Sequence, residues 1–152
     1  MIKIGIDVGS TTAKLVAVDE NDNLLFSKYE RHNAKAKETI LSFLKELLSE
    51  IGDKDISVRI TGSIGMGISE KCSLPFVQEV VAAAKAIQKD YSHVTSMIDI
   101  GGEDAKVVFF KDAEATDLRM NGNCAGGTGA FIDQMAIILG VNIDELNQLA
   151  MN

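Results

Sequence analysis

The stretches IDIGGEDAK (residues 98–106) and IDVGSTTAK (residues 6–14) are two copies of one pattern, and this repetition decides the fold. In each copy an apolar run leads to an aspartate, a glycine follows two residues later, and Ala-Lys opens a second apolar run. The offset continues into that second run, where LVAV (residues 15–18) aligns with VVFF (residues 107–110). Each copy indicates a strand, a tight turn and a returning strand, and the repeat predicts a duplicated architecture.

The segment up to residue 61 predicts three strands that form an antiparallel meander, then a helix and a fourth strand. The expected strands are residues 2–8, 13–18, 24–29 and 56–61, and the expected helix is residues 34–51. Apolar side chains recur in the helix at three- and four-residue intervals, and Gly52 ends the pattern as a C-cap. The apolar face of this helix is therefore expected to pack on the sheet.

Residues 61–67 (TGSIGMG) predict a flexible, glycine-spaced loop at the carboxyl end of the fourth strand, which is where open α/β sheets bind ligands. Pro75, the single proline, is expected to start a helix that runs over residues 76–89, because the first turn of a helix tolerates a missing N–H.

The second copy predicts another meander followed by helices. The expected strands are residues 94–100, 105–110 and 116–120, and the expected helices are residues 130–139 and a last one from residue 144. No later strand matches residues 56–61. We therefore expect an α/β chain with a mixed sheet, a βββαβα first lobe at residues 1–93 and a truncated second lobe at residues 94–152, as in a fragment of a longer chain.

Composition excludes several classes of protein. The chain has 152 residues and a formal net charge of −7, with no basic cluster of the kind that nucleic-acid-binding proteins carry. Its apolar runs are strand-sized, far short of the roughly 20 residues of a spanning helix, and its start has no signal-peptide pattern. We expect a cytoplasmic protein that binds neither nucleic acid nor membrane.

The repeated turn suits phosphate chemistry. A turn such as residues 7–12 (DVGSTT) points backbone N–H groups in one direction, adds hydroxyl donors and keeps a carboxylate near for Mg²⁺. Two such turns could hold a polyphosphate and its metal, and phosphoryl transfer needs mainly this positioning and charge neutralisation. A single Asp-x-Gly could be only a hairpin turn. The retention of Lys14 and Lys106 in the two copies favours a functional role.

The sequence resembles the actin, sugar kinase and heat-shock chaperone superfamily of ATPases, whose ribonuclease H-like lobes each carry an Asp-x-Gly phosphate loop. Within it, four segments in order are similar to the activators of 2-hydroxyacyl-CoA dehydratases, also called archerases, which include ATPase subunits of benzoyl-CoA reductase. These segments are residues 4–14, 78–80, 99–106 and 123–129. The resemblance implies a homodimeric ATPase that uses ATP and Mg²⁺ and passes an electron from a [4Fe–4S] cluster to a dehydratase or related reductase.

The resemblance also assigns roles to individual residues. The first phosphate loop is matched by Asp7, Gly9, Ser10, Thr11, Thr12 and Lys14. The second is matched by Asp99, Gly101, Gly102, Glu103 and Asp104. Asp7 and Asp99 become the expected magnesium ligands and, with Glu103, the expected catalytic residues. Many family members carry glutamine at the position of Glu103, where a carboxylate could orient water or a magnesium-bound ligand.

Cys124 matches the first cluster ligand of the family. It precedes a glycine-rich helix start, whose partial positive charge favours a thiolate and an anionic cluster. The family's second cluster cysteine and its adenosine-binding glycine motif have no counterpart before the sequence ends. A symmetric dimer would then supply two matching thiolates where a cubane takes four, so we expect no intact cluster on this chain alone.

Other hypotheses stay open. A sugar or amino-sugar kinase of the same superfamily would share the two loops but would not need Cys124. A non-catalytic interaction module would need no complete nucleotide site. Cys72 is interpreted as a small core residue, and His32 and His93 as surface residues near element ends. Glu79 could be a cleft residue by its position in the second matching segment.

Overall fold

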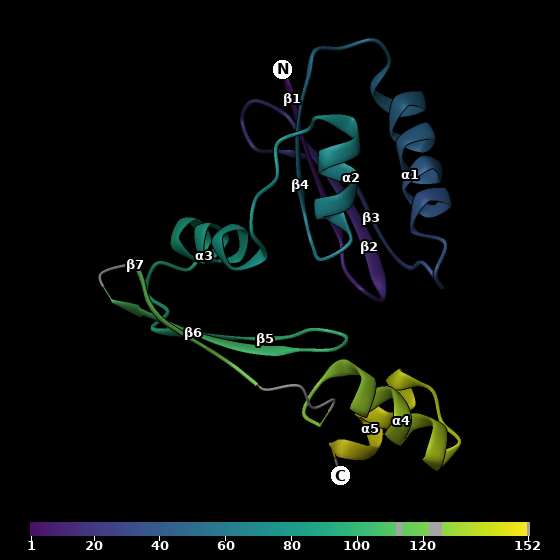
Figure 1. Cartoon of the computed structure of the whole chain (residues 1–152), viewed down its shortest axis with the longest axis vertical. Helices are drawn as coiled ribbons and strands as arrows, with labels where there is room; N and C mark the ends of the chain where they lie inside the picture. Colours follow the sequence, from purple (N-terminus) through teal and green to yellow (C-terminus); the bar gives the residue numbers. More distant parts are fainter. Residues whose placement is uncertain (112–113, 122–125, 152) are drawn as a thin grey trace. The chain divides into compact units, whose positions relative to one another are not determined.

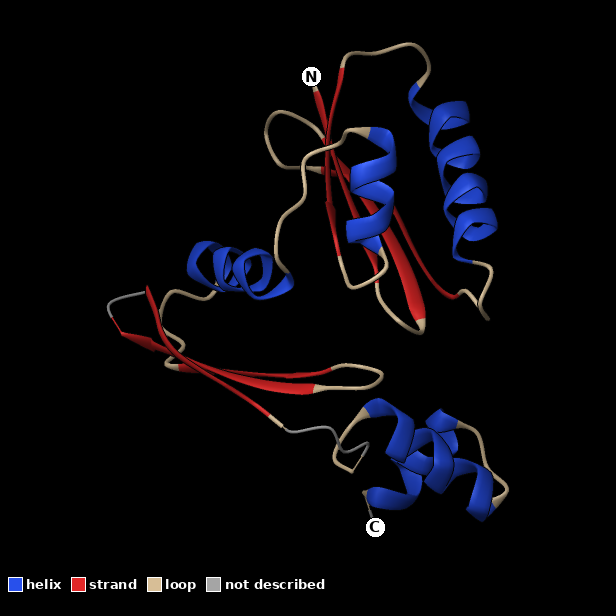
Figure 2. Cartoon of the chain, in the orientation of Figure 1, coloured by secondary structure: helices blue, strands red, loops and turns tan. Residues whose placement is uncertain are grey.

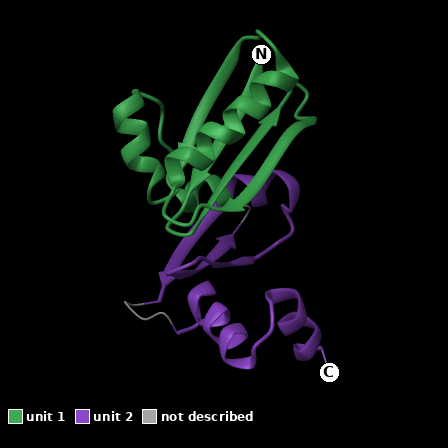
Figure 3. Cartoon of the chain, turned by 90° about the vertical axis from the view of Figure 1, so that its right-hand side faces the viewer, with its two compact units in different colours: residues 1–83 green, residues 84–152 purple. Residues whose placement is uncertain are grey.

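The computed structural model describes residues 1–111, 114–121 and 126–151, which form two compact units. Unit 1 is Met1–Ala83 and unit 2 is Ala84–Asn152 (Figure 3). The division falls inside helix α3 (Glu79–Asp90). Each unit has its own sheet, so the two copies of the repeat belong to different units.

The sheet of unit 1 contains β1 (Ile2–Val8), β2 (Thr12–Val18), β3 (Leu24–Arg31) and β4 (Ile56–Thr61) in the order β3-β2-β1-β4 (Figure 1). The first three strands are antiparallel neighbours, which confirms the predicted meander, and β4 pairs with β1 in parallel. A parallel pair needs a crossover connection, and α1 (Ala36–Ile51) supplies it between β3 and β4. The result is a mixed sheet, as the sequence predicts.

One face of this sheet carries the core of unit 1. The alternation of β1 puts every second side chain on that face, and the buried members are Ile2, Ile4, Ile6 and Val8. Helix α1 covers it with Ile40, Phe43, Leu47 and Ile51, and α2 (Gly65–Cys72) adds the partly buried Ile68. Gly52 ends α1 with φ 65° and donates its N–H to the Leu48 carbonyl oxygen, which confirms the predicted C-cap.

The turn between β2 and β3 is organised by one carboxylate. Asp19 accepts hydrogen bonds from the backbone N–H groups of Asn21 and Asn23 and from the Asn23 side-chain amide, at 2.8–2.9 Å. The Asn23 side chain contributes most to lowering the pKa of Asp19 below its usual value. This solvated turn fixes the hairpin without using the core.

The segment after β4 differs from its prediction in two places. The glycine-spaced loop is shorter than expected, because α2 begins at Gly65. Helix α3 begins at Glu79 rather than after Pro75, so the prediction for Pro75 is wrong. The Ile60 N–H donates to the Pro75 carbonyl oxygen at 3.0 Å, and Phe76 forms a parallel bridge with Ile60. Extended backbone beside β4 therefore replaces the expected first turn.

Cys72 is the last residue of α2 and its side chain is exposed. The interpretation of Cys72 as a core residue is therefore wrong. The buried residues of α2 are Gly65 and Ser69.

Unit 2 has a three-stranded antiparallel sheet and two helices (Figure 2). Its strands are β5 (Ser96–Ile100), β6 (Ala105–Lys111) and β7 (Glu114–Met120) in sequence order, and its helices are α4 (Gly129–Leu139) and α5 (Ile143–Ala150). Helix α5 begins with a capping box in which Asn142 and Glu145 bond to each other's backbone N–H groups at 2.9 and 2.8 Å. These elements confirm the predicted second meander and its helices.

Candidate functional site

The first repeat forms a hairpin whose tip is Ser10-Thr11. The Gly9 N–H donates to the Thr12 carbonyl oxygen at 3.0 Å and closes the turn. Just inside it, Asp7 and Lys14 lie opposite each other on β1 and β2, and the Lys14 Nζ contacts Asp7 Oδ2 at 2.8 Å. The side chains predicted for the first phosphate loop are thus neighbours on one hairpin.

Asp7 has acceptor capacity that the described residues do not use. Its Oδ1 is buried and has no hydrogen-bond partner among them, although the side chain as a whole is 24% exposed. The Thr61 hydroxyl, on the residue paired with Asp7 in β4, is a second buried oxygen without a partner in the described chain. A carboxylate with one unused oxygen, on a side chain that is partly exposed, suits Mg²⁺, which usually binds one or two carboxylates and keeps several waters. The residues present therefore fit this cation.

A glycine holds the neighbouring loop against this carboxylate. Gly62 has φ 92°, and a Cβ built on it would lie 2.6 Å from Asp7 Oδ1 and closer still to the Val8 carbonyl oxygen. The same carbonyl accepts a hydrogen bond from the Ile64 N–H at 2.9 Å. The sequence indicated a ligand-binding loop here but not this role of Gly62, which only the approach of the loop to β1 reveals.

The second repeat forms the same hairpin in unit 2. The Gly101 N–H donates to the Asp104 carbonyl oxygen at 2.8 Å, as the Gly9 N–H does to Thr12 in the first copy. Asp99 and Lys106 lie opposite each other on β5 and β6. Glu103 is exposed at the tip of the turn. The repeat seen in the sequence is therefore a repeat in register and in backbone hydrogen bonding.

The two lysines differ in their surroundings. Lys106 is 7% exposed and lies 2.8 Å from Asp104 and 3.9 Å from Asp99, whereas the side chain of Lys14 is 46% exposed. One buried cation thus faces two carboxylates in the second loop, which leaves an excess negative charge there. That excess would attract an added cation.

Helix α4 is joined to the second loop through its first amides. The Gly129 N–H donates to the Gly101 carbonyl oxygen at 2.8 Å, and the Ala130 N–H donates to the Gly102 carbonyl oxygen at 3.0 Å. A Cβ on Gly129 would lie 3.0 Å from the Gly101 oxygen, so a side chain there would crowd the contact. Two N–H groups that a helix start leaves without an intrahelical partner are satisfied in this way.

Three other predicted residues have different outcomes. Cys124 lies outside the described residues. Glu79 is the first residue of α3 and is partly buried. His32, expected at the surface, is 4% exposed, so that interpretation is wrong. It lies just after β3 and its Nε2 is 3.0 Å from the Gly9 carbonyl oxygen. This contact has no local signal in the sequence, because it depends on how β3 pairs with β2.

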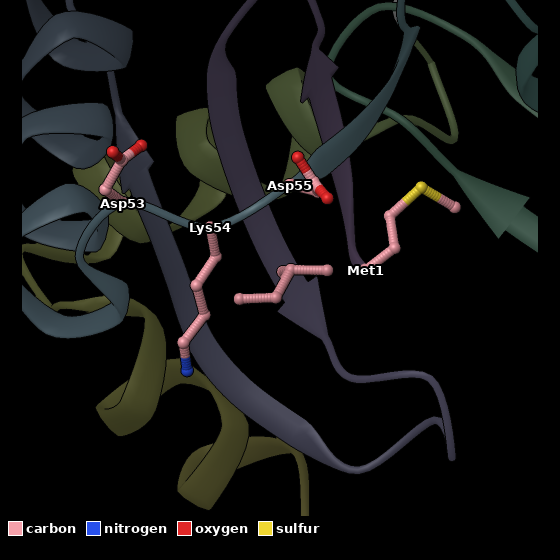
Figure 4. Close-up of a pocket in the computed structure, with 5 residues that line it drawn as sticks. Met1, Asp53, Lys54 and Asp55 are labelled. Atoms are coloured by element: carbon pink, nitrogen blue, oxygen red, sulfur yellow. The ribbon is translucent and has the colours of Figure 1, made fainter.

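A hollow of about 470 Å³ lies at the opposite end of β1 from Asp7 (Figure 4). Its lining is Met1, Ile2, Asp53, Lys54 and Asp55. None of the residues predicted for the phosphate loops contributes to it. This hollow is therefore separate from the predicted loop residues.

No group of three or more His, Cys, Asp or Glu side chains among residues 1–111, 114–121 and 126–151 could hold a metal ion. Within the same residues, no helix has the length and apolar character needed to cross a membrane.

Several known proteins are similar to this chain in sequence. The model of the BadF/BadG/BcrA/BcrD ATPase family matches residues 4–152. The chain is 28% identical over 148 residues to the (R)-2-hydroxyglutaryl-CoA dehydratase activating ATPase of Acidaminococcus fermentans, covering 96% of this chain and 56% of the relative. It is 31% identical over 165 residues to the 2-hydroxyisocaproyl-CoA dehydratase activator of Clostridioides difficile, covering 100% and 58%.

A solved structure of similar fold is also that of a dehydratase activator. The activator of the 2-hydroxyisocaproyl-CoA dehydratase from Clostridium difficile, solved with bound ADPNP, matches with a TM-score of 0.86 and 30% identity. The match covers 100% of this chain and 57% of that one. The expected actin-like ATPase fold is thereby confirmed, and the chain spans less than two thirds of the length of these relatives.

Proposed function

The chain belongs to the BadF/BadG/BcrA/BcrD ATPase family, and we propose that it acts as the ATP-hydrolysing, iron–sulfur-dependent activator of a 2-hydroxyacyl-CoA dehydratase or a related reductase. The named relatives support the partner, since two of them are activators of such dehydratases. The observation that carries the proposal is the repeated Asp–Lys pair beside each loop, with the same register in both units.

We assign the chemistry of ATP to the two loops. Asp7 in the first loop and Asp99 in the second would hold Mg²⁺, which would supply positive charge to offset the negative charge that develops on the phosphoryl oxygens. Backbone N–H groups and hydroxyls of Gly9, Ser10, Thr11 and Thr12 bind phosphate oxygens in the first loop, with Lys14 as a mobile counter-charge. Gly101, Gly102 and Asp104 form the second loop, where Glu103 orients the attacking water.

The proposed electron transfer depends on Cys124. In a homodimer it would bind an iron–sulfur cluster, which supplies one electron of low potential when bound. The hydrogen bonds from Gly129 and Ala130 to the second loop connect that loop to the start of α4. A rearrangement of Gly101 and Gly102 on hydrolysis would therefore reach the segment that follows Cys124. We further propose lobes at residues 1–93 and 94–152 and a cytoplasmic location.

The Cys124→Ser variant separates ATP hydrolysis from electron transfer to the dehydratase. Cys124→Ser is expected to abolish reductive activation of the dehydratase and to leave ATP hydrolysis within about twofold of the unmodified protein, because Cys124 does not contact phosphate in this scheme. Steady-state ATPase and dehydratase activation assays under anaerobic conditions measure both quantities. Cys72→Ser is the matched control and should change neither.

Activation at the normal rate by the Cys124→Ser variant would contradict the redox role. A rise in ATP consumption on addition of a sugar or amino sugar would instead support a kinase of the same superfamily. Failure of the chain to bind Mg-ADPNP in calorimetry would favour an interaction module.

A further inference from the structure

His32 is a buried histidine with two contacts to the tip of the first loop. Its backbone N–H donates to the Thr11 carbonyl oxygen at 3.2 Å, and its Nε2 lies 3.0 Å from the Gly9 carbonyl oxygen. A carbonyl oxygen can only accept, so Nε2 carries the hydrogen and donates it. His32 Nδ1 is buried and has no hydrogen-bond partner among the described residues. The ring therefore makes its one hydrogen bond within these residues to the loop.

These two contacts set the direction of the backbone N–H groups of Ser10 and Thr12. In a planar trans peptide the carbonyl of one residue and the N–H of the next point in opposite directions. Holding the Gly9 carbonyl toward His32 therefore turns the Ser10 N–H away from it, and holding the Thr11 carbonyl does the same for Thr12. N–H groups aligned in this way form an anion-binding concavity.

The second copy of the repeat fixes the equivalent carbonyl with a different donor. Gly101 stands where Gly9 stands in the first copy, and its carbonyl oxygen accepts the Gly129 N–H from the start of α4 at 2.8 Å. The same peptide is thus anchored in both hairpins, by an imidazole in unit 1 and by a helix amide in unit 2. Two unrelated donors at one position of the repeat indicate that the orientation of this peptide matters.

We propose that His32 is a positioning residue for phosphate binding: its Nε2–H holds the Gly9–Ser10 peptide so that the Ser10 N–H faces the phosphate. This inference rests on the proposed nucleotide-binding function of the first loop. His32 itself does not touch the nucleotide. It replaces, in unit 1, the anchor that α4 provides in unit 2.

The test uses two variants at one position and one control. His32→Phe keeps a ring but removes the donor, and it should weaken the affinity for Mg-ADPNP about tenfold, the effect of one buried hydrogen bond. His32→Gln places an amide N–H within reach of the Gly9 oxygen and should restore the affinity to within about threefold of the unmodified chain. His93→Phe changes an exposed histidine and should have no effect. Calorimetry measures all three.

A second measurement does not need a nucleotide. Hydrogen exchange of the amides of residues 9–12 should be faster in His32→Phe than in His32→Gln, with the amides of β1 unchanged. Unaltered exchange in both variants, or unaltered affinity in His32→Phe, would overturn the proposal. If the unmodified chain binds no nucleotide but the exchange changes as expected, the proposed function fails while the anchoring role of His32 stands.

Discussion

Gly62→Ala is expected to lower the free energy of unfolding of unit 1 by about 3 kcal/mol or more, in one of the largest effects of any single substitution. The added Cβ would lie 2.6 Å from Asp7 Oδ1 and nearer still to the Val8 carbonyl oxygen. Both atoms belong to a strand in the middle of the sheet, so neither can move away at small cost. The backbone φ of 92° adds strain for any residue with a side chain.

Chemical denaturation followed by circular dichroism measures this loss. Gly67→Ala is the matched control, since Gly67 lies inside α2 and a Cβ there would meet no atom within 4 Å. Alanine is the better helix former, so the control should gain roughly 0.5–1 kcal/mol. A Gly62→Ala variant as stable as the unmodified chain would show that the loop does not approach β1 as described.

Asp7→Asn is expected to reduce Mg²⁺-dependent ATP hydrolysis by about 100-fold or more. The amide keeps the shape of the carboxylate but loses the charge that holds the cation and pairs with Lys14. The fold should persist, because the side chain is partly solvent-exposed and its volume is unchanged. Turnover as a function of magnesium concentration, together with the melting temperature, separates loss of the metal from loss of the fold.

Asp22→Asn provides the comparison for this prediction. Asp22 lies in the turn between β2 and β3, at the other end of β2 from the loop, and pairs with Lys3 at 2.9 Å. The Asp22→Asn variant therefore loses a similar ion pair away from the loop. Its ATP hydrolysis should match that of the unmodified protein. If Asp7→Asn retained half or more of the normal turnover, the assignment of Asp7 as a magnesium ligand would be wrong.

The hairpins were predictable from the sequence because their signals are local. The alternation of apolar residues in β1 and the shared offset between the copies predict the strands and place Asp7 opposite Lys14. The end of α1 at Gly52 follows from the same kind of local pattern.

The features that escaped prediction depend on contacts between distant segments. Pro75 could open a helix by its own chemistry, but pairing with Ile60 draws this segment into an extended form. His32 has no partner nearby in sequence, and its contact with Gly9 exists only because β3 lies beside β2. The packing of Gly62 against Asp7 likewise requires β4 to lie beside β1.

The pairing of Asp7 with Lys14 has a consequence for the order in which the protein folds. The two residues are 7 positions apart, within a hairpin of the kind that forms in about 1–10 μs. The pairing of β1 with β4 joins Ile2 to Ile56 and must wait for a much longer loop to close. We therefore expect the charged pair to assemble early and in water. Gly62 then covers Asp7 only as the parallel strand docks, late on the folding pathway.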